Sequence, residues 1–109
     1  MPPVIIVSNL TPVDDIAVEP MLAVLAKWVP IMQRRPGCQL YAISRGRGRA
    51  RGRYLLLERW VDDEAFHGYG KSTELHGLHE EIEPYVESLE DFFVYAPVRL
   101  REPADGTPL

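Results

Sequence analysis

The chain has 109 residues, a formal net charge of −4 and 46% hydrophobic residues, which suits one folded domain with its own core. This composition excludes an intrinsically disordered chain, and the longest apolar runs are far shorter than the ~20 residues of a membrane helix. The sequence shows no secretory signal at its start, and the single cysteine, Cys38, excludes an internal disulfide. We therefore expect a cytoplasmic protein without a membrane partner.

The first half of the chain predicts a strand, a helix and a second strand. Residues 3–10, PVIIVSNL, form a β-branched apolar run typical of a strand, and a loop follows at 11–15. Apolar residues at helical spacing then predict a helix that ends at residues 34–37, RRPG, with Pro30 bending its last part. Residues 38–44 alternate as in a strand, with Gln39, Tyr41 and Ile43 expected on one face.

A loop rich in arginine and glycine connects the second and third strands. Arginines at positions 45, 47, 49, 51 and 53 are interleaved with glycines. Such repeats occur in nucleic-acid-binding tails, but no aromatic residue lies between these arginines, and the rest of the chain is acidic and would repel phosphates. We expect a solvated hairpin tip and no nucleic-acid partner, with one arginine pairing with a ligand carboxylate as the smaller alternative.

The second half predicts a strand, a broken helix and a final strand. Residues 54–60 read as the third strand, acids at 62–64 begin a helix, and glycines at 68 and 70 interrupt it. Ser72 or Thr73 is expected to cap the next helix, and residues 91–98 predict the fourth strand. The order β-α-β-β-α-β predicts an α+β, ferredoxin-like domain at 1–98 with a four-stranded antiparallel sheet, followed by a flexible tail at 99–109.

The predicted strands are apolar on both faces, although only one face can be covered by the two predicted helices. A sheet of this kind needs a second apolar surface against its other face. We therefore expect a homodimer in which two copies pack their sheets together by isologous contact.

Two histidines lie on the last predicted helix, and their positions differ. At about 100° per residue, His79 falls beside the apolar direction of this helix, whereas His76 turns toward solvent. An inward imidazole can accept a proton or bind a metal, and the alternative is a core-edge histidine paired with Glu83. A zinc site at His76 and His79 lacks a third ligand at suitable spacing, so we expect no metal ion.

Two passages, PGCQLYAISR at 36–45 and YLLLERWVDDEAFHGYGKSTELHGLH at 54–79, resemble the antibiotic biosynthesis monooxygenase (ABM) superfamily of dimeric α+β barrels. The resemblance covers roughly residues 4–98. It implies the same fold and a dimer. The superfamily includes cofactor-free quinone-forming oxygenases, heme-degrading enzymes, aldehyde isomerases and members with no known activity.

The resemblance to two branches of the superfamily implies different site residues. In the oxygenase branch, Trp60 matches a tryptophan, while the expected Asn and Tyr fall on Leu56 and Phe66. In the heme-degrading branch, the matching positions are Asn9 at the end of the first strand, Tyr69 in place of a tryptophan, and His79 as the axial ligand. Asn9 has a second interpretation, as a side chain that caps the turn before Pro12.

The resulting hypothesis is a cofactor-independent monooxygenase that oxidises a small aromatic or quinol-type substrate with dioxygen. In it His79 deprotonates the substrate, and Asn9 and Trp60 place and polarise the intermediate. Tyr69, Tyr41 and Phe66 are the expected substrate-binding side chains. The alternatives are a heme-binding or heme-degrading protein with His79 as axial ligand, and a non-catalytic dimeric ligand-binding module.

Overall fold

A computed structural model describes residues 2–100, and residues 101–109 of the predicted tail lie outside this part of the chain. Nine elements follow one another: β1 (Val4–Leu10), α1 (Val18–Gln33), β2 (Cys38–Arg45), η1 (Gly48–Ala50), β3 (Tyr54–Trp60), α2 (Asp63–Gly70), α3 (Thr73–Ile82), η2 (Glu83–Tyr85) and β4 (Phe92–Tyr95). The strands form one antiparallel sheet in the order β2-β3-β1-β4. This order confirms the predicted ferredoxin-like α+β fold.

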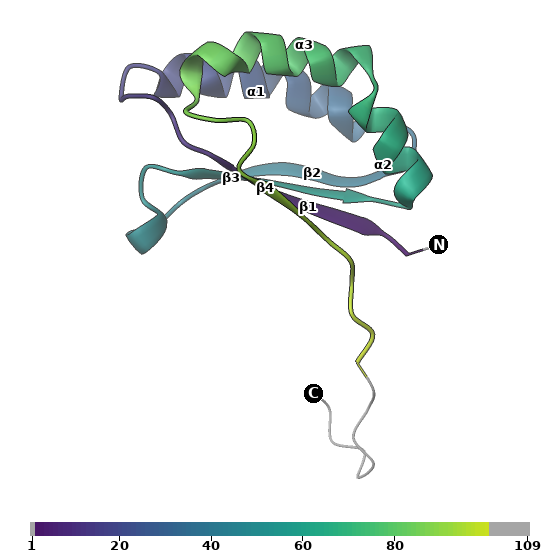
Figure 1. Cartoon of the computed structure of the whole chain (residues 1–109). Helices are drawn as coiled ribbons and strands as arrows, with labels where there is room; N and C mark the ends of the chain where they lie inside the picture. Colours follow the sequence, from purple (N-terminus) through teal and green to yellow (C-terminus); the bar gives the residue numbers. More distant parts are fainter. Residues whose placement is uncertain (1, 101–109) are drawn as a thin grey trace.

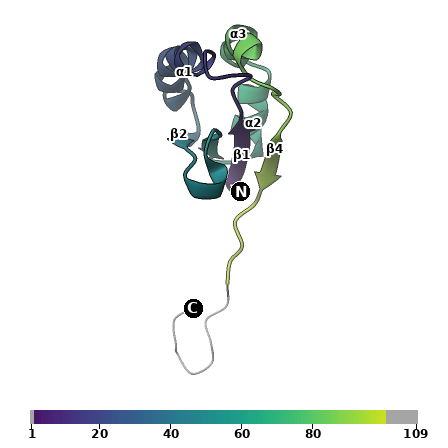
Figure 2. The same ribbon diagram turned by 90° about the vertical axis from the view of Figure 1, so that its left-hand side faces the viewer.

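The helices all cover the same face of the sheet. Figures 1 and 2 show α1 and α3 side by side above the strands, with α2 closing one end of this layer. The apolar stripe of α1 points into the space between the layers, where Met21, Leu25 and Met32 have at most 1% of their surface exposed. No helix within residues 2–100 is long and apolar enough to cross a membrane.

The predicted break in the second helix separates α2 from α3. Each of the two helices begins with a side-chain cap: Asp62 Oδ1 accepts a hydrogen bond from the Ala65 amide at 2.9 Å, and Ser72 Oγ accepts one from the Leu75 amide at 3.1 Å. The Ser72 hydroxyl also donates to the Tyr69 carbonyl at 2.6 Å. These bonds confirm Ser72 as the cap and fix the corner at which the chain turns from α2 into α3.

Two strand details differ from the prediction. β4 covers residues 92–95 instead of 91–98, because Tyr95 already pairs with Ile5 next to the start of β1 and because Pro97 has no N–H for a ladder. A bulge between Cys38 and Leu40 moves Gln39 away from the face of Tyr41. Gln39 Oε1 accepts a hydrogen bond from Arg59 Nε at 2.9 Å on the side of the sheet opposite the helices.

The arginine-rich loop forms an ordered hairpin tip that projects away from the helices (Figure 1). Gly48 and Gly52 have φ values of 58° and 85°, which favour glycine, and the turn between β2 and β3 includes η1. The five arginines are exposed, and none of them forms an ion pair within residues 2–100.

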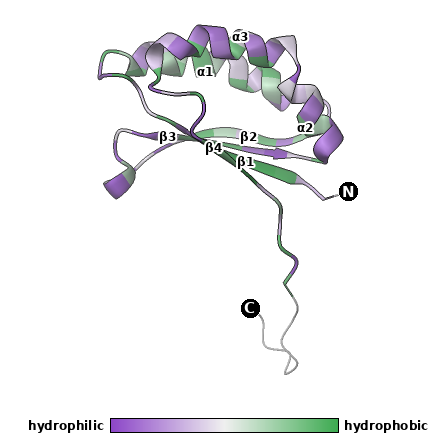
Figure 3. Cartoon of the chain, viewed as in Figure 1, coloured by the Kyte–Doolittle hydropathy of each residue, from purple (hydrophilic) through white to green (hydrophobic). Residues whose placement is uncertain are grey.

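Strand alternation gives the sheet two different faces. Along β3, Tyr54, Leu56, Glu58 and Trp60 point toward the helices and are buried, whereas the intervening residues point away. Hydrophobic residues run along β1 and line the inner sides of the helices in Figure 3. The face covered by the helices therefore contains most of the core, and it includes one acidic residue.

Candidate functional site

A cavity of about 210 Å³ lies between the sheet and the helix layer. Its floor comes from alternate residues of β1 and β3, and its roof comes from α2 and α3. Most of its lining is apolar and includes Ile6, Leu25, Leu56, Leu78, Ile82 and Phe92. Since a dry cavity of about 150 Å³ admits benzene, this volume suits one aromatic ring with substituents.

Three aromatic side chains from different elements form one end of the cavity region. Tyr69 of α2 stacks on Trp60 of β3, with ring centroids 4.4 Å apart and an interplanar angle of 27°. Tyr41 of β2 meets both rings edge-on, at 5.9 Å from Tyr69 and 6.4 Å from Trp60. Tyr41 and Tyr69 line the cavity, and the fully buried Trp60 ring supports them from behind.

The two tyrosine hydroxyls form a hydrogen-bonded pair inside the protein. Their oxygens are 2.9 Å apart, and both side chains are buried. Burial raises the pKa of each phenol above its ordinary value of 10.0, and the charge of Glu58 raises it further. Both tyrosines therefore keep their protons at neutral pH, and one of these two protons lies in the hydrogen bond between them.

Glu58 is the acidic residue on the floor of the cavity, and only 3% of its surface is exposed. Trp60 Nε1 donates a hydrogen bond to Glu58 Oε1 at 3.0 Å. Burial raises the pKa of the carboxyl from 4.5 to about 7, while hydrogen bonds from Trp60 and Tyr69 act in the opposite direction. Glu58 therefore exists in both protonation states near neutral pH.

His79 lies at the mouth of the cavity. Its side chain lines both the cavity and a neighbouring surface hollow, and Gly70 and Leu75 are shared by the same two spaces. Partial burial lowers the pKa of the imidazole below 6.5, the nearby charge of His76 lowers it further, and Glu83 opposes this change. The imidazole is therefore mostly neutral at pH 7 and can accept a proton.

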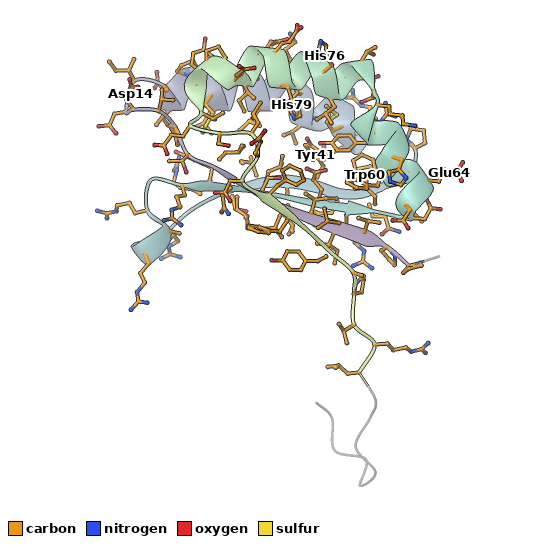
Figure 4. All side chains as sticks on the ribbon, viewed as in Figure 1. Asp14, Tyr41, Trp60, Glu64, His76 and His79 are labelled. Atoms are coloured by element: carbon orange, nitrogen blue, oxygen red, sulfur yellow. The ribbon has the colours of Figure 1, made fainter. Side chains whose placement is uncertain are left out.

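His76 lies on the outer side of α3, whereas His79 lies on the side that faces the sheet (Figure 4). The His76 imidazole is 2.9 Å from Glu80 Oε1, and its side chain is 76% exposed. Within residues 2–100, no three side chains of the metal-binding types lie close enough together to hold an ion.

The candidate residues taken from the sequence do not all share the cavity. Tyr69, Tyr41, Phe66 and His79 line it, whereas Trp60 lies behind Tyr69. Asn9 falls between Ser8 and Leu10 on β1, and these two neighbours both line the cavity, so the Asn9 side chain points to the other face of the sheet.

Glu58 was not identified from the sequence, although a signal was present. On a strand, residues two apart point to the same side, so Glu58 shares the face of Leu56 and Trp60. A carboxyl at an inward position of an apolar strand is unusual and indicates a polar group inside the core.

The cavity does not fit a heme. Its volume of about 210 Å³ is below the ~300–1,000 Å³ typical of pockets that bind drug-sized molecules. A porphyrin with its side chains is larger than most drug-sized molecules, so it needs a larger pocket than this one.

The fold and the cavity define a small α+β domain that encloses a compact aromatic site between its sheet and its helices. The family model "Antibiotic biosynthesis monooxygenase" matches residues 3–81, and the chain belongs to this family. No curated protein sequence matches the chain significantly.

Solved structures share this fold at low sequence identity. A conserved protein from Methanosarcina mazei Go1 is 13% identical, with a TM-score of 0.78 over 87% of this chain and 92% of the other. A mutant of SnoaB from Streptomyces nogalater, a cofactor-independent oxygenase, is 18% identical, with a TM-score of 0.75 over 94% and 99%. Protein SO0527 from Shewanella oneidensis is 25% identical, with a TM-score of 0.70 over 88% and 89%.

Proposed function

We propose that this protein is a cofactor-independent monooxygenase that oxidises a small phenol or quinol with dioxygen. The observation that carries the proposal is the apolar cavity with tyrosine walls, which has the proton-accepting imidazole of His79 at its mouth. Family membership and the resemblance to a cofactor-independent oxygenase support the reaction type. The cavity volume supports a substrate of one ring with small substituents.

In this reaction the protein prepares the substrate for direct attack on dioxygen. His79 accepts the proton of a substrate hydroxyl, the O–H electron pair stays on the oxygen, and the electron-rich ring then reduces dioxygen. For a 1,4-quinol, four electrons pass from the substrate to dioxygen, one oxygen atom enters the ring, and the other leaves as water. The products are a hydroxyquinone and water, so atoms and electrons balance.

The side chains around the cavity position the ring and exclude water. Tyr69, Tyr41 and Phe66 form walls against which an aromatic substrate packs, and Trp60 holds Tyr69 in place by stacking. The apolar lining keeps bulk water away from the oxygenated intermediate and reduces side reactions.

We further propose that the working form is a cytoplasmic homodimer. The face of the sheet opposite the helices carries exposed apolar side chains, including Leu40, Phe93 and Tyr95. A second copy placed against this face buries the same residues of both subunits, as an isologous contact requires.

The proposed function is tested by dioxygen uptake with hydroquinone and related one-ring quinols. We expect His79→Ala to lower turnover by about 10²-fold, the lower end of the range for general acid–base catalysis, because the proton acceptor at the mouth is lost. The matched control is His76→Ala, since His76 lies on the same helix but points to solvent. Its turnover should stay close to that of the wild type.

Stability measurements separate a catalytic role of His79 from a structural one. His79 borders the cavity but, like His76, keeps much of its surface exposed to solvent. Both histidine variants should therefore change the free energy of unfolding by less than about 0.5 kcal/mol. Equal turnover in the wild type and in His79→Ala contradicts the role of His79. Ligand binding without any dioxygen uptake instead indicates the non-catalytic binding module.

A further inference from the structure

The carboxyl group of Glu58 is a buried ionisable group that the mechanism above does not use. It lies at the centre of the sheet, where Glu58 pairs with Ile6 of β1 on one side and with Tyr41 of β2 on the other. The side chain lines the cavity, and within residues 2–100 it forms no ion pair. A carboxylate in such surroundings is costly for folding, and this cost suggests a chemical role.

One oxygen of this carboxyl is held in place by the surrounding side chains. Oε1 accepts the hydrogen bond from Trp60 Nε1 at 3.0 Å, and the Tyr69 hydroxyl lies close enough to favour the ionised form of the carboxyl. A phenol has one proton to give, so a Tyr69 hydroxyl that donates to Glu58 accepts from Tyr41. The bond from Trp60 therefore orients the carboxyl on the floor of the cavity, and the hydrogen-bonded tyrosine pair lies beside it.

The ionisable groups that face Glu58 come from three elements. Tyr41 and Cys38 approach from β2, Tyr69 approaches from α2, and His79 of α3 closes the opposite side of the cavity. None of these groups is a permanent cation. Burial therefore dominates, and the pKa of Glu58 lies at about 7, so that a substantial fraction of the protein holds the ionised, proton-accepting form at neutral pH.

We infer that Glu58 is a second catalytic base, which accepts the proton of the substrate hydroxyl that points toward the sheet. The inference rests on the proposed function. In this step the substrate O–H bond breaks, the proton moves to a carboxylate oxygen of Glu58, and the electron pair stays on the substrate oxygen. The electrons then pass to dioxygen as described above. A quinol has two hydroxyl protons, and the floor and the mouth of the cavity each provide an acceptor for one of them.

The test compares Glu58→Gln with the wild type in dioxygen uptake with hydroquinone across pH. Glutamine has the same shape and still accepts the hydrogen bond from Trp60, but it does not accept a proton. We expect kcat/KM to fall by about 10²-fold, and the rise in kcat/KM of the wild type near pH 7 to disappear. In Glu58→Gln, the rise in kcat/KM at lower pH, which comes from the titration of His79, should remain.

A conservative variant and a fold control keep this test decisive. Glu58→Asp retains a carboxylate, so its kcat/KM should still rise with pH near neutrality even if the rate falls. Circular dichroism and thermal unfolding show whether each variant is folded. A folded Glu58→Gln protein with the turnover and pH limb of the wild type overturns the inference.

Infrared spectroscopy of the wild type tests Glu58 independently of the oxygenation reaction. The carboxyl bands of Glu58 are those that Glu58→Gln removes, and phenol is the probe ligand. Binding of phenol at pH 8 should shift the carboxylate band, because the phenol hydroxyl donates to it. A shift without any dioxygen uptake on quinols supports the proton-accepting site while the proposed function fails. Bound phenol without a shift, or no binding of phenol, overturns the inference.

Discussion

The two faces of the sheet are built from the same strands, yet they differ in how they are completed. The face toward the helices is closed by α1, α2 and α3, and it surrounds a cavity that contains Glu58 and two tyrosines. The opposite face has no cover within residues 2–100, and Phe93 and Tyr95 of β4 are 56% and 53% exposed there. One face therefore holds buried polar groups, and the other shows exposed apolar groups.

This difference indicates a division of roles between the faces. Buried polar groups need specific partners, which Trp60 and the tyrosine pair provide around Glu58. Exposed apolar groups on a strand face need a second surface, and no helix of the described chain provides one. In the proposed function, the closed face holds the ligand chemistry and the open face holds the contact between subunits.

The largest expected effect comes from placing a charge on the open face. Phe93→Asp puts one carboxylate from each subunit into the proposed dimer interface, where neither has a cationic partner. We expect the dimer dissociation constant to rise by roughly 10³-fold, equivalent to about 4 kcal/mol. Sedimentation equilibrium of the wild type and the variant measures this change.

Phe93→Leu is the control, because it keeps the position apolar. This variant should dimerise within about tenfold of the wild type. A wild-type chain that is monomeric at all concentrations contradicts the assignment of the open face to assembly.

The second effect concerns the free energy of unfolding, which is lowered when the buried Glu58 carboxyl on the closed face is ionised. Because the pKa of Glu58 is raised from 4.5 to about 7 on folding, the folded protein binds this proton more tightly than the unfolded chain does. The contribution of Glu58 is therefore fully favourable below pH 4.5 and is lost as the pH rises through about 7. At pH 8 the wild type carries a penalty on the order of 3 kcal/mol that Glu58→Gln lacks.

Urea unfolding at two pH values measures this penalty. Glu58→Gln should be more stable than the wild type at pH 8, and the difference should shrink as the pH falls toward 4. A difference that does not change with pH shows that Glu58 titrates normally, and that the closed face holds no perturbed acid.

The smallest effect concerns the roof of the cavity. Ser72 caps α3 and bonds to the end of α2, so Ser72→Ala should lower the free energy of unfolding by about 1 kcal/mol. Ser44→Ala on the exposed part of β2 is the control and should be nearly neutral. Thermal unfolding of the three proteins provides the comparison, and an unchanged midpoint for Ser72→Ala contradicts the capping role.

The fold could be predicted from the sequence because local patterns agreed with one another. The alternation in residues 54–60, the acids at 62–64 and Ser72 each indicate a strand, a helix start or a cap without reference to the rest of the chain. The end of β4 could not be predicted, because it depends on where β1 begins. The position of Gln39 depends on a bulge that only pairing with β3 defines.

The site was less predictable, since it depends on which face each strand residue takes. His79 could be placed by helical periodicity and Tyr69 by the resemblance, and both line the cavity. Asn9 is implied by the resemblance alone, and strand alternation turns its side chain away from the face of Ser8 and Leu10. The interior position of Glu58 follows from the same alternation on β3.

The corner between α2 and α3 has a consequence for how substrate size is set. Gly70 borders both the cavity and the outer hollow, and a Cβ atom added there would meet no heavy atom within 4 Å. A side chain introduced at position 70 would therefore occupy open space at the border of the cavity and the outer hollow, and it would not displace atoms of the core. We therefore expect a substitution at Gly70 to change which molecules reach the cavity more than it changes the stability of the core.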